Sequence, residues 1–428
     1  MFDKIKKIYK LILASALLAG AVSCLCGFAF TLPKGVTVNG VEVGGLTYKT
    51  AAELVRNNIA EELKTRSLTV KGEKDTYTFR YPEINYRDNL FSLLKCAKKG
   101  DNLTCNVSYY LCGINDIARA ICLNERTEVR EPSATFNKSG EPFTYDGGND
   151  GKEADEKKLI ADLKASLSGD FTPVTLAYTG VNRKTTLESV KNSTKLLASF
   201  TTCFDGNNLT RVSNIRLAAS KLNGSIVHSG KTLSFNDTVG ERVKSRGFLP
   251  AKIIVNGEFT EGIGGGVCQV STTLYNCALL AGFSIEEYHP HSLSVSYVPP
   301  SRDAMVSGSS CDLKIKNNSG CPAYIRATTG KSFVKFEIYG LYGGADYSVT
   351  SEVTGTLPAP EESCDSPDKA RAGKDGLTSQ SYLTVTRDGY TKTTLLRKDK
   401  YQPVKGYRYD DPDGEVPPEP DPAEDTDP

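Results

Sequence analysis

The sequence predicts a multidomain α+β protein anchored to a membrane. We expect a tandem α+β N-terminal region, a mixed but mainly antiparallel second domain and a small β module. Three observations carry this prediction. An uncharged run of 20 residues lies near the N-terminus, helix-like and strand-like patterns alternate after it, and short strand-like runs dominate the second half.

Composition limits the classes of function. The 428 residues are 39% hydrophobic and 24% charged, which suits a globular chain of two or three domains. A formal net charge of +1 gives no global field that would attract nucleic acid. Neither a basic stripe with interleaved aromatic residues nor a P-loop occurs, so we expect no nucleic-acid partner.

The N-terminal segment indicates the compartment. Residues 1–31 comprise a lysine-rich tip and an uncharged run from Leu11 to Phe30, which is long enough as a helix to cross a bilayer. Lysines before the run place the N-terminus in the cytoplasm and the bulk of the chain outside the cell membrane. The run is long for a cleaved signal and lacks a clean cleavage site, which favours a single-pass anchor.

The pattern of residues 32–195 predicts two α+β units in tandem. The first begins with a hairpin over Val36–Val43 and continues into a helix with Thr47 as N-cap. A similar order of strand, glycine turn, helix and strand returns later. It begins at Phe143–Asp146 and includes a helix capped by Asp155.

Residues 196–345 are expected to form a mixed domain with mostly antiparallel strands. Its helices are predicted over Ile215–Leu222 and over Val270–Leu280, the second closed by Gly282 as its C′ residue. The strand-like runs are Thr232–Phe235, Ala251–Glu258, Ser284–Tyr288, Ser292–Val298, Asp312–Lys316, Tyr324–Ala327 and Phe333–Tyr339.

The last part of the chain is predicted to be less compact. Residues 346–378 are rich in Pro, Glu and Ser, which is typical of a linker. Residues 379–410 are expected to form a small β module with a hairpin over Ser379–Leu396. Residues 411–428 are acidic and proline-rich, which predicts a disordered tail.

The strongest chemical signal is Cys268, which follows three glycines at a predicted helix start. A helix N-terminus favours a thiolate over a thiol. Gly264, Gly265 and Gly266 allow a substrate backbone or a developing oxyanion to approach the N–H groups of this turn.

Two of the three histidines of the chain, His289 and His291, follow soon after the cysteine. If a strand from Phe283 returns along the helix, both rings lie on the face that meets the thiol. Either one would serve as the base for a cysteine nucleophile. A zinc site made by Cys268 and both histidines is the competing interpretation, although no fourth ligand is evident.

Three further residues are assigned possible supporting roles. Asp303 or Asp312 would orient a histidine as the third member of a relay. Arg302 would bind a substrate carboxylate with two parallel hydrogen bonds. We expect no metal and no cofactor under this cysteine interpretation.

Six motifs stand out along the chain: EADEKKLIADLKASL at 153–167, NIRLAA at 214–219, LSFN at 233–236, GGGVCQVSTTLYN at 264–276, HPHS at 289–292 and YVPPSRDA at 297–304. By the last five, the stretch from Thr201 to about Gly340 resembles the VanW-like family. By the first, the preceding region resembles the peptidoglycan-binding domain that often comes before a VanW domain. The final hairpin resembles a short G5-like module.

The resemblance implies a function at the cell wall. Some anchored members of the family resemble L,D-transpeptidases that join peptidoglycan stem peptides through a cysteine. By that resemblance Cys268 would be the nucleophile, and N–H groups near Gly266 and Cys268 would form the oxyanion hole. Gln269 and Ser271, in the same motif, are included among the oxyanion and substrate-binding residues.

We therefore predict a cysteine enzyme that forms 3–3 cross-links in peptidoglycan, with stem peptides and glycan as partners. Two alternatives stay open at this point. One is a non-catalytic scaffold that binds peptidoglycan and has a structural cysteine, and the other is a zinc-dependent wall hydrolase.

Overall fold

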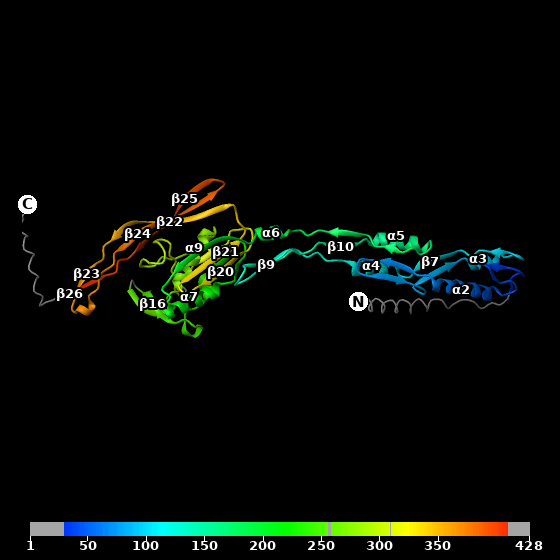
Figure 1. The fold of residues 1–428 in the computed structure, drawn as a ribbon, viewed down its shortest axis with the longest axis horizontal. Coiled ribbons are helices and arrows are strands. Elements are labelled where there is room, and N and C mark those ends of the chain that lie inside the picture. Colours follow the sequence, from blue (N-terminus) through cyan, green and yellow to red (C-terminus); the bar gives the residue numbers. More distant parts are fainter. Residues whose placement is uncertain (1–29, 256–257, 309, 410–428) are drawn as a thin grey trace, which may run out of the picture. The chain divides into compact units, whose positions relative to one another are not determined.

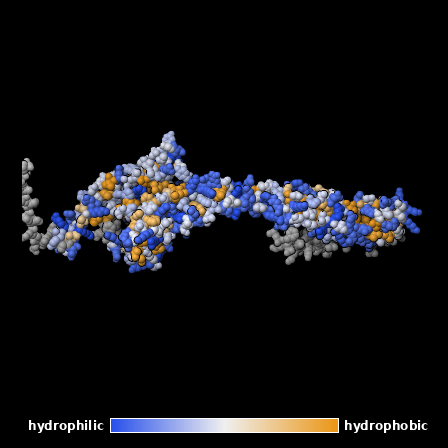
Figure 2. All heavy atoms as spheres, in the orientation of Figure 1, coloured by the Kyte–Doolittle hydropathy of each residue, from blue (hydrophilic) through white to orange (hydrophobic). Residues whose placement is uncertain are grey.

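The computed structural model describes residues 30–255, 258–308 and 310–409 (Figure 1). The predicted anchor up to residue 29 and the predicted tail 411–428 lie outside these residues. Within the described ranges, no helix is both long and apolar enough to cross a bilayer. The chain divides into two compact units, Met1–Glu131 with Gly148–Lys184 and Pro132–Gly147 with Thr185–Pro428. On the face shown in Figure 2, hydrophobic and hydrophilic residues are interspersed in both units.

The first unit is α+β, as the sequence predicted. Thr47 caps its first helix by accepting a hydrogen bond from the Thr50 N–H, and Asp155 caps a later helix by accepting one from Lys158 N–H. Its elements are β1 (Thr37–Val38), β2 (Val41–Glu42), α2 (Tyr48–Thr65), β3 (Leu68–Lys71), β4 (Thr76–Phe79), β5 (Ile84–Asp88), α3 (Leu90–Lys95), β6 (Asn102–Leu103), β7 (Val107–Leu111), α4 (Ile114–Glu125), β10 (Gly151–Ala154), α5 (Glu156–Leu167), β11 (Val174–Thr175) and β12 (Tyr178–Val181).

The predicted tandem repeat is interrupted. The strand expected at Phe143–Asp146 forms as β9, but it pairs with β8 (Ser133–Phe136) and belongs to the second unit. The cause is aromatic packing. The Phe143 ring lies 5.1 Å from that of Tyr324 and 5.6 Å from that of Tyr339, both in the second unit.

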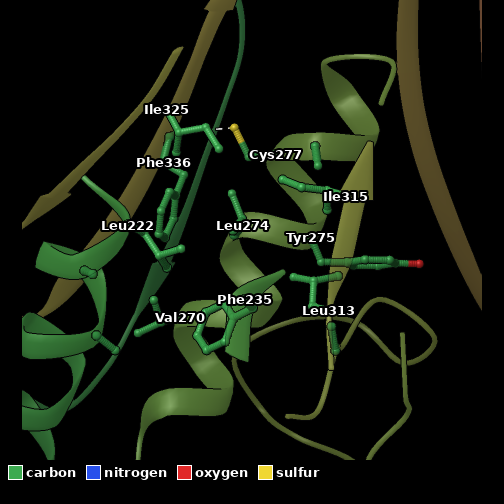
Figure 3. Packing of buried hydrophobic residues seen from close by; sticks show 14 of the residues in the cluster. Leu222, Phe235, Val270, Leu274, Tyr275, Cys277, Leu313, Ile315, Ile325 and Phe336 are labelled. Carbon is green, nitrogen blue, oxygen red and sulfur yellow. Dashed lines mark hydrogen bonds between the residues drawn. The ribbon is translucent and has the colours of Figure 1, made fainter. Parts of the chain in front are cut away.

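A four-stranded sheet and two helices form the core of the second unit. The strand order is β13 (Lys195–Cys203), β21 (Phe333–Gly340), β20 (Ala323–Thr329) and β14 (Ser225–Val227), and all neighbours are antiparallel. Helices α7 (Leu209–Leu222) and α9 (Val267–Leu280) pack against it. Figure 3 shows Leu222, Leu274, Ile325 and Phe336 meeting in this core.

Helix α9 lies inside the second unit rather than on its surface. Apart from Cys268 and Leu280, all of its residues are buried, including the polar Thr273 and Asn276. Gly282 follows with φ +77° and donates its N–H to the Leu279 carbonyl at 3.1 Å, so the predicted C-terminal stop is confirmed. The Cys277 side chain is fully buried and belongs to the core cluster drawn in Figure 3.

Smaller elements surround this core. The predicted strand Ser292–Val298 is not a strand, because Pro290 and Pro299 bracket it and the Ser292 carbonyl accepts from Gln402 N–H instead of a ladder partner. The remaining elements before residue 345 are α6 (Leu187–Asn192), β15 (Thr232–Ser234), α8 (Phe235–Val239), η1 (Lys244–Arg246), β16 (Pro250–Val255), β17 (Glu258–Ile263), β18 (Ser284–Glu287) and β19 (Lys314–Lys316).

The C-terminal region is more ordered than expected. The predicted linker 346–378 instead contains β22 (Ala345–Leu357), β23 (Glu361–Cys364) and η2 (Pro367–Lys369), because β22 finds an antiparallel partner in β24 (Gly376–Arg387). The predicted hairpin is present, with Arg387 of β24 opposite Tyr390 of β25 (Tyr390–Tyr401). The last strand, β26 (Gly406–Tyr409), pairs in parallel with β23.

Candidate active site

The turn before α9 needs glycine at three successive positions. Gly264 and Gly266 have φ angles of +88° and +103°, which residues with side chains rarely adopt. A Cβ on Gly265 would lie 2.6 Å from the Lys252 carbonyl oxygen. Asn214 of α7 holds the turn, because its Nδ2 donates to the Gly265 carbonyl at 3.0 Å. These contacts fix where α9 begins.

Cys268 is the second residue of α9 and lines a cleft of about 1270 Å³. Burial raises the pKa of its thiol, but the hydrogen bond and charge of His291 outweigh burial, so that the pKa is lowered. Arg242 contributes further positive charge, and Sγ lies 3.4 Å from the Val306 carbonyl oxygen. The Cys268 thiol is therefore more acidic than an ordinary cysteine thiol, which favours the thiolate form.

His291 is the imidazole that meets this thiol. It is 6% exposed, and its Nδ1 lies 2.6 Å from Asp303 Oδ2. The same oxygen accepts from the His291 backbone N–H at 2.7 Å. Burial lowers the pKa of His291, but hydrogen bonds to Asp303 and Cys268 outweigh it and raise the pKa to about 9. The three residues form a continuous Cys–His–Asp arrangement.

Asp303 is fully buried and is held by the C-terminal module. Arg397 of β25 donates from Nη2 to Asp303 Oδ1 at 2.9 Å and from Nη1 to the Asp303 carbonyl at 2.6 Å. Tyr401 at the end of β25 donates its hydroxyl to the same Oδ1 at 2.5 Å. Burial raises the pKa of Asp303, but His291, Arg397 and Tyr401 together lower it to about 2. The carboxylate thus stays ionised while buried.

His289 points to other partners. Its Nε2 lies 3.0 Å from Glu287 Oε1, and its backbone carbonyl accepts from Met305 N–H. It is not among the residues that line the cleft with Cys268. The strand β18 ends at Glu287, so the two histidines lie in a loop and do not share a strand face. The structure therefore selects His291 over His289 as the neighbour of the thiol.

Asp312 and Arg302 have other partners than the ones expected from the sequence. The Asp312 carboxylate accepts from the Ser234 hydroxyl at 2.5 Å and from Asn236 N–H at 2.9 Å. The Arg302 guanidinium donates to Asn276 Oδ1 at 2.9 Å and lies over the Phe200 ring. Neither residue lines the cleft.

The other residues of the motif divide between the cleft and the interior. Gly264, Gly266 and Gln269 line the cleft, whereas Ser271 is fully buried and donates its hydroxyl to the Ala304 carbonyl at 2.6 Å. The N–H groups of Val267 and Gln269 donate to carbonyls of the glycine turn. Those two N–H groups are therefore used within the turn, and the N–H groups of Gly266 and Cys268 are the expected oxyanion donors.

The zinc interpretation is not supported by this geometry. A zinc ion would need both imidazole rings beside Cys268. The His289 ring is instead bound to Glu287, and the His291 Nδ1 is bound to Asp303. Over the described parts of the chain, no three His, Cys, Asp or Glu side chains come together in a way that would hold a metal ion.

Several residues of the site escaped sequence analysis. Arg211 and Arg242 line the cleft next to Cys268, and Arg397 and Tyr401 hold Asp303. No motif marked the two arginines, although Arg211 lies one helical turn before the conspicuous NIRLAA motif. The other two lie in a module that appeared independent of the site.

Comparison with known proteins gives the family. Residues 210–339 match the family model described as VanW like protein. The chain contains a VanW-like domain. The matched residues contain Cys268, His291 and Asp303 but end before Arg397 and Tyr401. The predicted resemblance of the preceding region to a peptidoglycan-binding domain stays a prediction.

Two curated relatives share this VanW-like domain. "Uncharacterized protein YoaR" of Bacillus subtilis (strain 168) is 44% identical over 135 residues, 32% of this chain and 45% of that protein. "Vancomycin B-type resistance protein VanW" of Enterococcus faecalis (strain ATCC 700802 / V583) is 30% identical over 150 residues, 32% of this chain and 54% of that protein. The matches thus span about half the length of each relative. No solved structure matches the chain.

Proposed function

We propose that this VanW-like protein is a cysteine acyl transferase of the cell wall, an L,D-transpeptidase that forms 3–3 cross-links in peptidoglycan. The observation that carries the proposal is the Cys268–His291–Asp303 arrangement at the edge of a large cleft. The cell-wall setting is supported by the similarity to a protein named for resistance to vancomycin.

The first step forms a thioester. Cys268 Sγ attacks the amide carbonyl between a diaminopimelate-type third residue and the terminal D-Ala of a donor stem. The oxyanion that develops lies at the start of α9, where the Cys268 N–H and the helix dipole stabilise it. The His291 imidazolium gives its proton to the leaving nitrogen as the C–N bond breaks, and D-Ala departs.

The second step transfers the acyl group. The amine of an acceptor stem gives a proton to the now neutral His291 and attacks the thioester carbonyl. The C–S bond breaks, the thiolate returns, and an amide joins the third residues of two stems. Asp303 keeps the His291 ring oriented in both steps through its bond to Nδ1.

The test compares two cysteine variants of the full chain. Disaccharide-tetrapeptide is incubated with wild type, Cys268→Ala and Cys203→Ala, and dimers are identified by mass spectrometry. Cys203 lies on β13 and is exposed, so its variant controls for loss of a thiol elsewhere. We expect wild type and Cys203→Ala to form 3–3 dimers and Cys268→Ala to form none. Dimers from Cys268→Ala would rule out the mechanism.

The same proposal includes a location outside the cytoplasmic membrane, with a single N-terminal anchor. It is supported by the lysines before the uncharged run Leu11–Phe30. Cell fractionation with external protease checks it. The second unit should be cleaved in intact protoplasts, and full protection there would contradict the location.

A further inference from the structure

Arg211 lies directly against the glycine turn of the active site. It sits in the first turn of α7, and a Cβ on Gly266 would lie 3.0 Å from Arg211 Cγ. Glycine at 266 thus leaves room for the arginine stem to pass beside the start of α9. The side chain reaches the cleft that Cys268 lines.

A buried amide fixes the direction of the Arg211 guanidinium. Gln269 donates its Nε2 to Thr202 Oγ1 at 3.0 Å and to the Cys203 carbonyl at 2.8 Å. Those two bonds leave its Oε1 for Arg211, whose Nη2 donates to it at 2.9 Å. Since Gln269 follows Cys268 in α9, the guanidinium is tied to the residue next to the nucleophile.

One end of this guanidinium is unsatisfied. Arg211 Nη1 is buried and has no hydrogen-bond partner within the described part of the chain. A buried N–H of a charged group without an acceptor costs free energy, and native structures rarely leave such a group without a partner. An anionic ligand would supply the missing acceptor.

The charge of the cleft favours such a ligand. Five lysine and arginine side chains line it, against two acidic side chains, Asp237 and Glu241. Arg242 contacts the first glycine of the turn, because a Cβ added at Gly264 would lie 3.0 Å from Arg242 Cβ. Two arginine side chains therefore contact the turn that precedes the nucleophile.

We propose that Arg211 binds a carboxylate of the substrate next to Cys268, so that the ligand is a peptide with a free carboxylate close to the scissile amide. Arg242 adds positive charge without being the primary contact, because its Nη2 already donates to Asn236 Oδ1 at 2.7 Å. The assignment rests on the proposed acyl transfer at Cys268, and it adds the recognition element of the donor.

Two alkylating reagents test the carboxylate site without any cross-linking reaction. Iodoacetate and iodoacetamide differ by one negative charge, and peptide mass spectrometry reads modification at Cys268 alone. Because both reagents react with the same thiolate, the ratio of their rates does not depend on the fraction of Cys268 that is ionised. We expect Arg211→Gln to lower the ratio of iodoacetate to iodoacetamide about tenfold, the value of one charge-assisted hydrogen bond.

Arg216→Gln is the matched control, because Arg216 lies on the same helix but is exposed and outside the cleft. Its ratio should stay within about twofold of wild type, since a distant exposed charge is screened. Arg211→Lys keeps the charge without the planar fork and should give an intermediate ratio. An unchanged ratio in both Arg211 variants would overturn the carboxylate site.

The outcomes separate this inference from the proposed function. Slow alkylation of wild-type Cys268 by both reagents at neutral pH would contradict the proposed acyl transfer. Fast alkylation, with a ratio of iodoacetate to iodoacetamide that does not change in the Arg211 variants, would contradict only the carboxylate site. A tetrapeptide stem amidated at its terminal carboxylate then identifies the group. If amidation lowers kcat/KM for wild type but not for Arg211→Gln, Arg211 binds the terminal carboxylate. If amidation leaves kcat/KM of wild type unchanged, Arg211 binds a carboxylate elsewhere in the stem.

Discussion

The contact between the C-terminal module and Asp303 gives a prediction that the structure allows us to quantify. The change is Tyr401→Phe, which removes one oxygen and keeps the ring in its place. Tyr401 is 1% exposed, and its hydroxyl donates to Asp303 Oδ1 at 2.5 Å while accepting from Ser301 N–H at 2.7 Å. Without it, a buried carboxylate loses a donor and a buried N–H loses its acceptor.

The expected loss of stability follows from these two groups. Each unsatisfied buried group costs about 1–2 kcal/mol, so the variant should lose about 2–4 kcal/mol. In a unit of this size that corresponds to a Tm lower by roughly 5–15 °C. Asp303 keeps its bonds to Arg397 and His291, so the enzyme should remain folded, with acylation slowed between about tenfold and a hundredfold.

The pH dependence makes the prediction sharper. Because the pKa of Asp303 is lowered to about 2, the stability that it contributes is full above its unfolded pKa of about 4 and is lost as pH falls toward 2. Tyr401 is one of the groups that lower this pKa. The Tm difference between wild type and Tyr401→Phe should therefore be larger at pH 7 than at pH 3.

The assay is thermal unfolding followed by circular dichroism at the two pH values, together with single-turnover acylation. Tyr390→Phe is the control, because Tyr390 begins the same strand and is 84% exposed. It should unfold at the wild-type temperature. The reasoning about Asp303 fails if Tyr401→Phe and Tyr390→Phe behave alike in both Tm and acylation.

Three further outcomes are expected. Because the pKa of the Cys268 thiol is lowered and that of His291 is raised to about 9, acylation should fall at acidic pH as the thiolate is protonated, and again above about pH 9 as the imidazolium is lost; a pH–rate profile checks both limbs. Asp303→Asn should reduce kcat by about 10³-fold or more, whereas Asp312→Asn, measured in the same assay, should leave kcat near wild type and lower only Tm. Gly266→Ala should cost about 1–2 kcal/mol in urea unfolding, because an L residue is strained at φ +103°, and a wild-type midpoint would contradict that strain.

Much of the local structure could be predicted from sequence because it is encoded by neighbouring residues. The cap at Thr47, the cap at Asp155 and the stop of α9 at Gly282 each depend on a few residues in a row. The hairpin of β24 and β25 follows from the Asp388-Gly389 turn, whose φ angles are both positive. These features need no partner from elsewhere in the chain.

The errors arose where distant segments meet. Composition predicted a linker over 346–378. The segment instead forms the strand β22, which is hydrogen-bonded along its length to β24, and composition does not reveal this pairing. The strand predicted over Ser292–Val298 was inferred from alternation, yet its backbone bonds go elsewhere. His289 and His291 were equivalent by spacing, and only the positions of Glu287 and Asp303 distinguish them.

The sequence by itself indicated the VanW-like domain and a candidate nucleophile, because a cysteine after three glycines at a helix start is a local pattern with its own physical meaning. Tertiary structure alone decided which histidine faces the thiol, and that Arg397 and Tyr401, 94 and 98 residues beyond Asp303, hold the carboxylate behind it. The reason is that helix and turn signals act over a few residues. The partners of a buried charge, by contrast, are chosen by whichever strands the folded core brings against it.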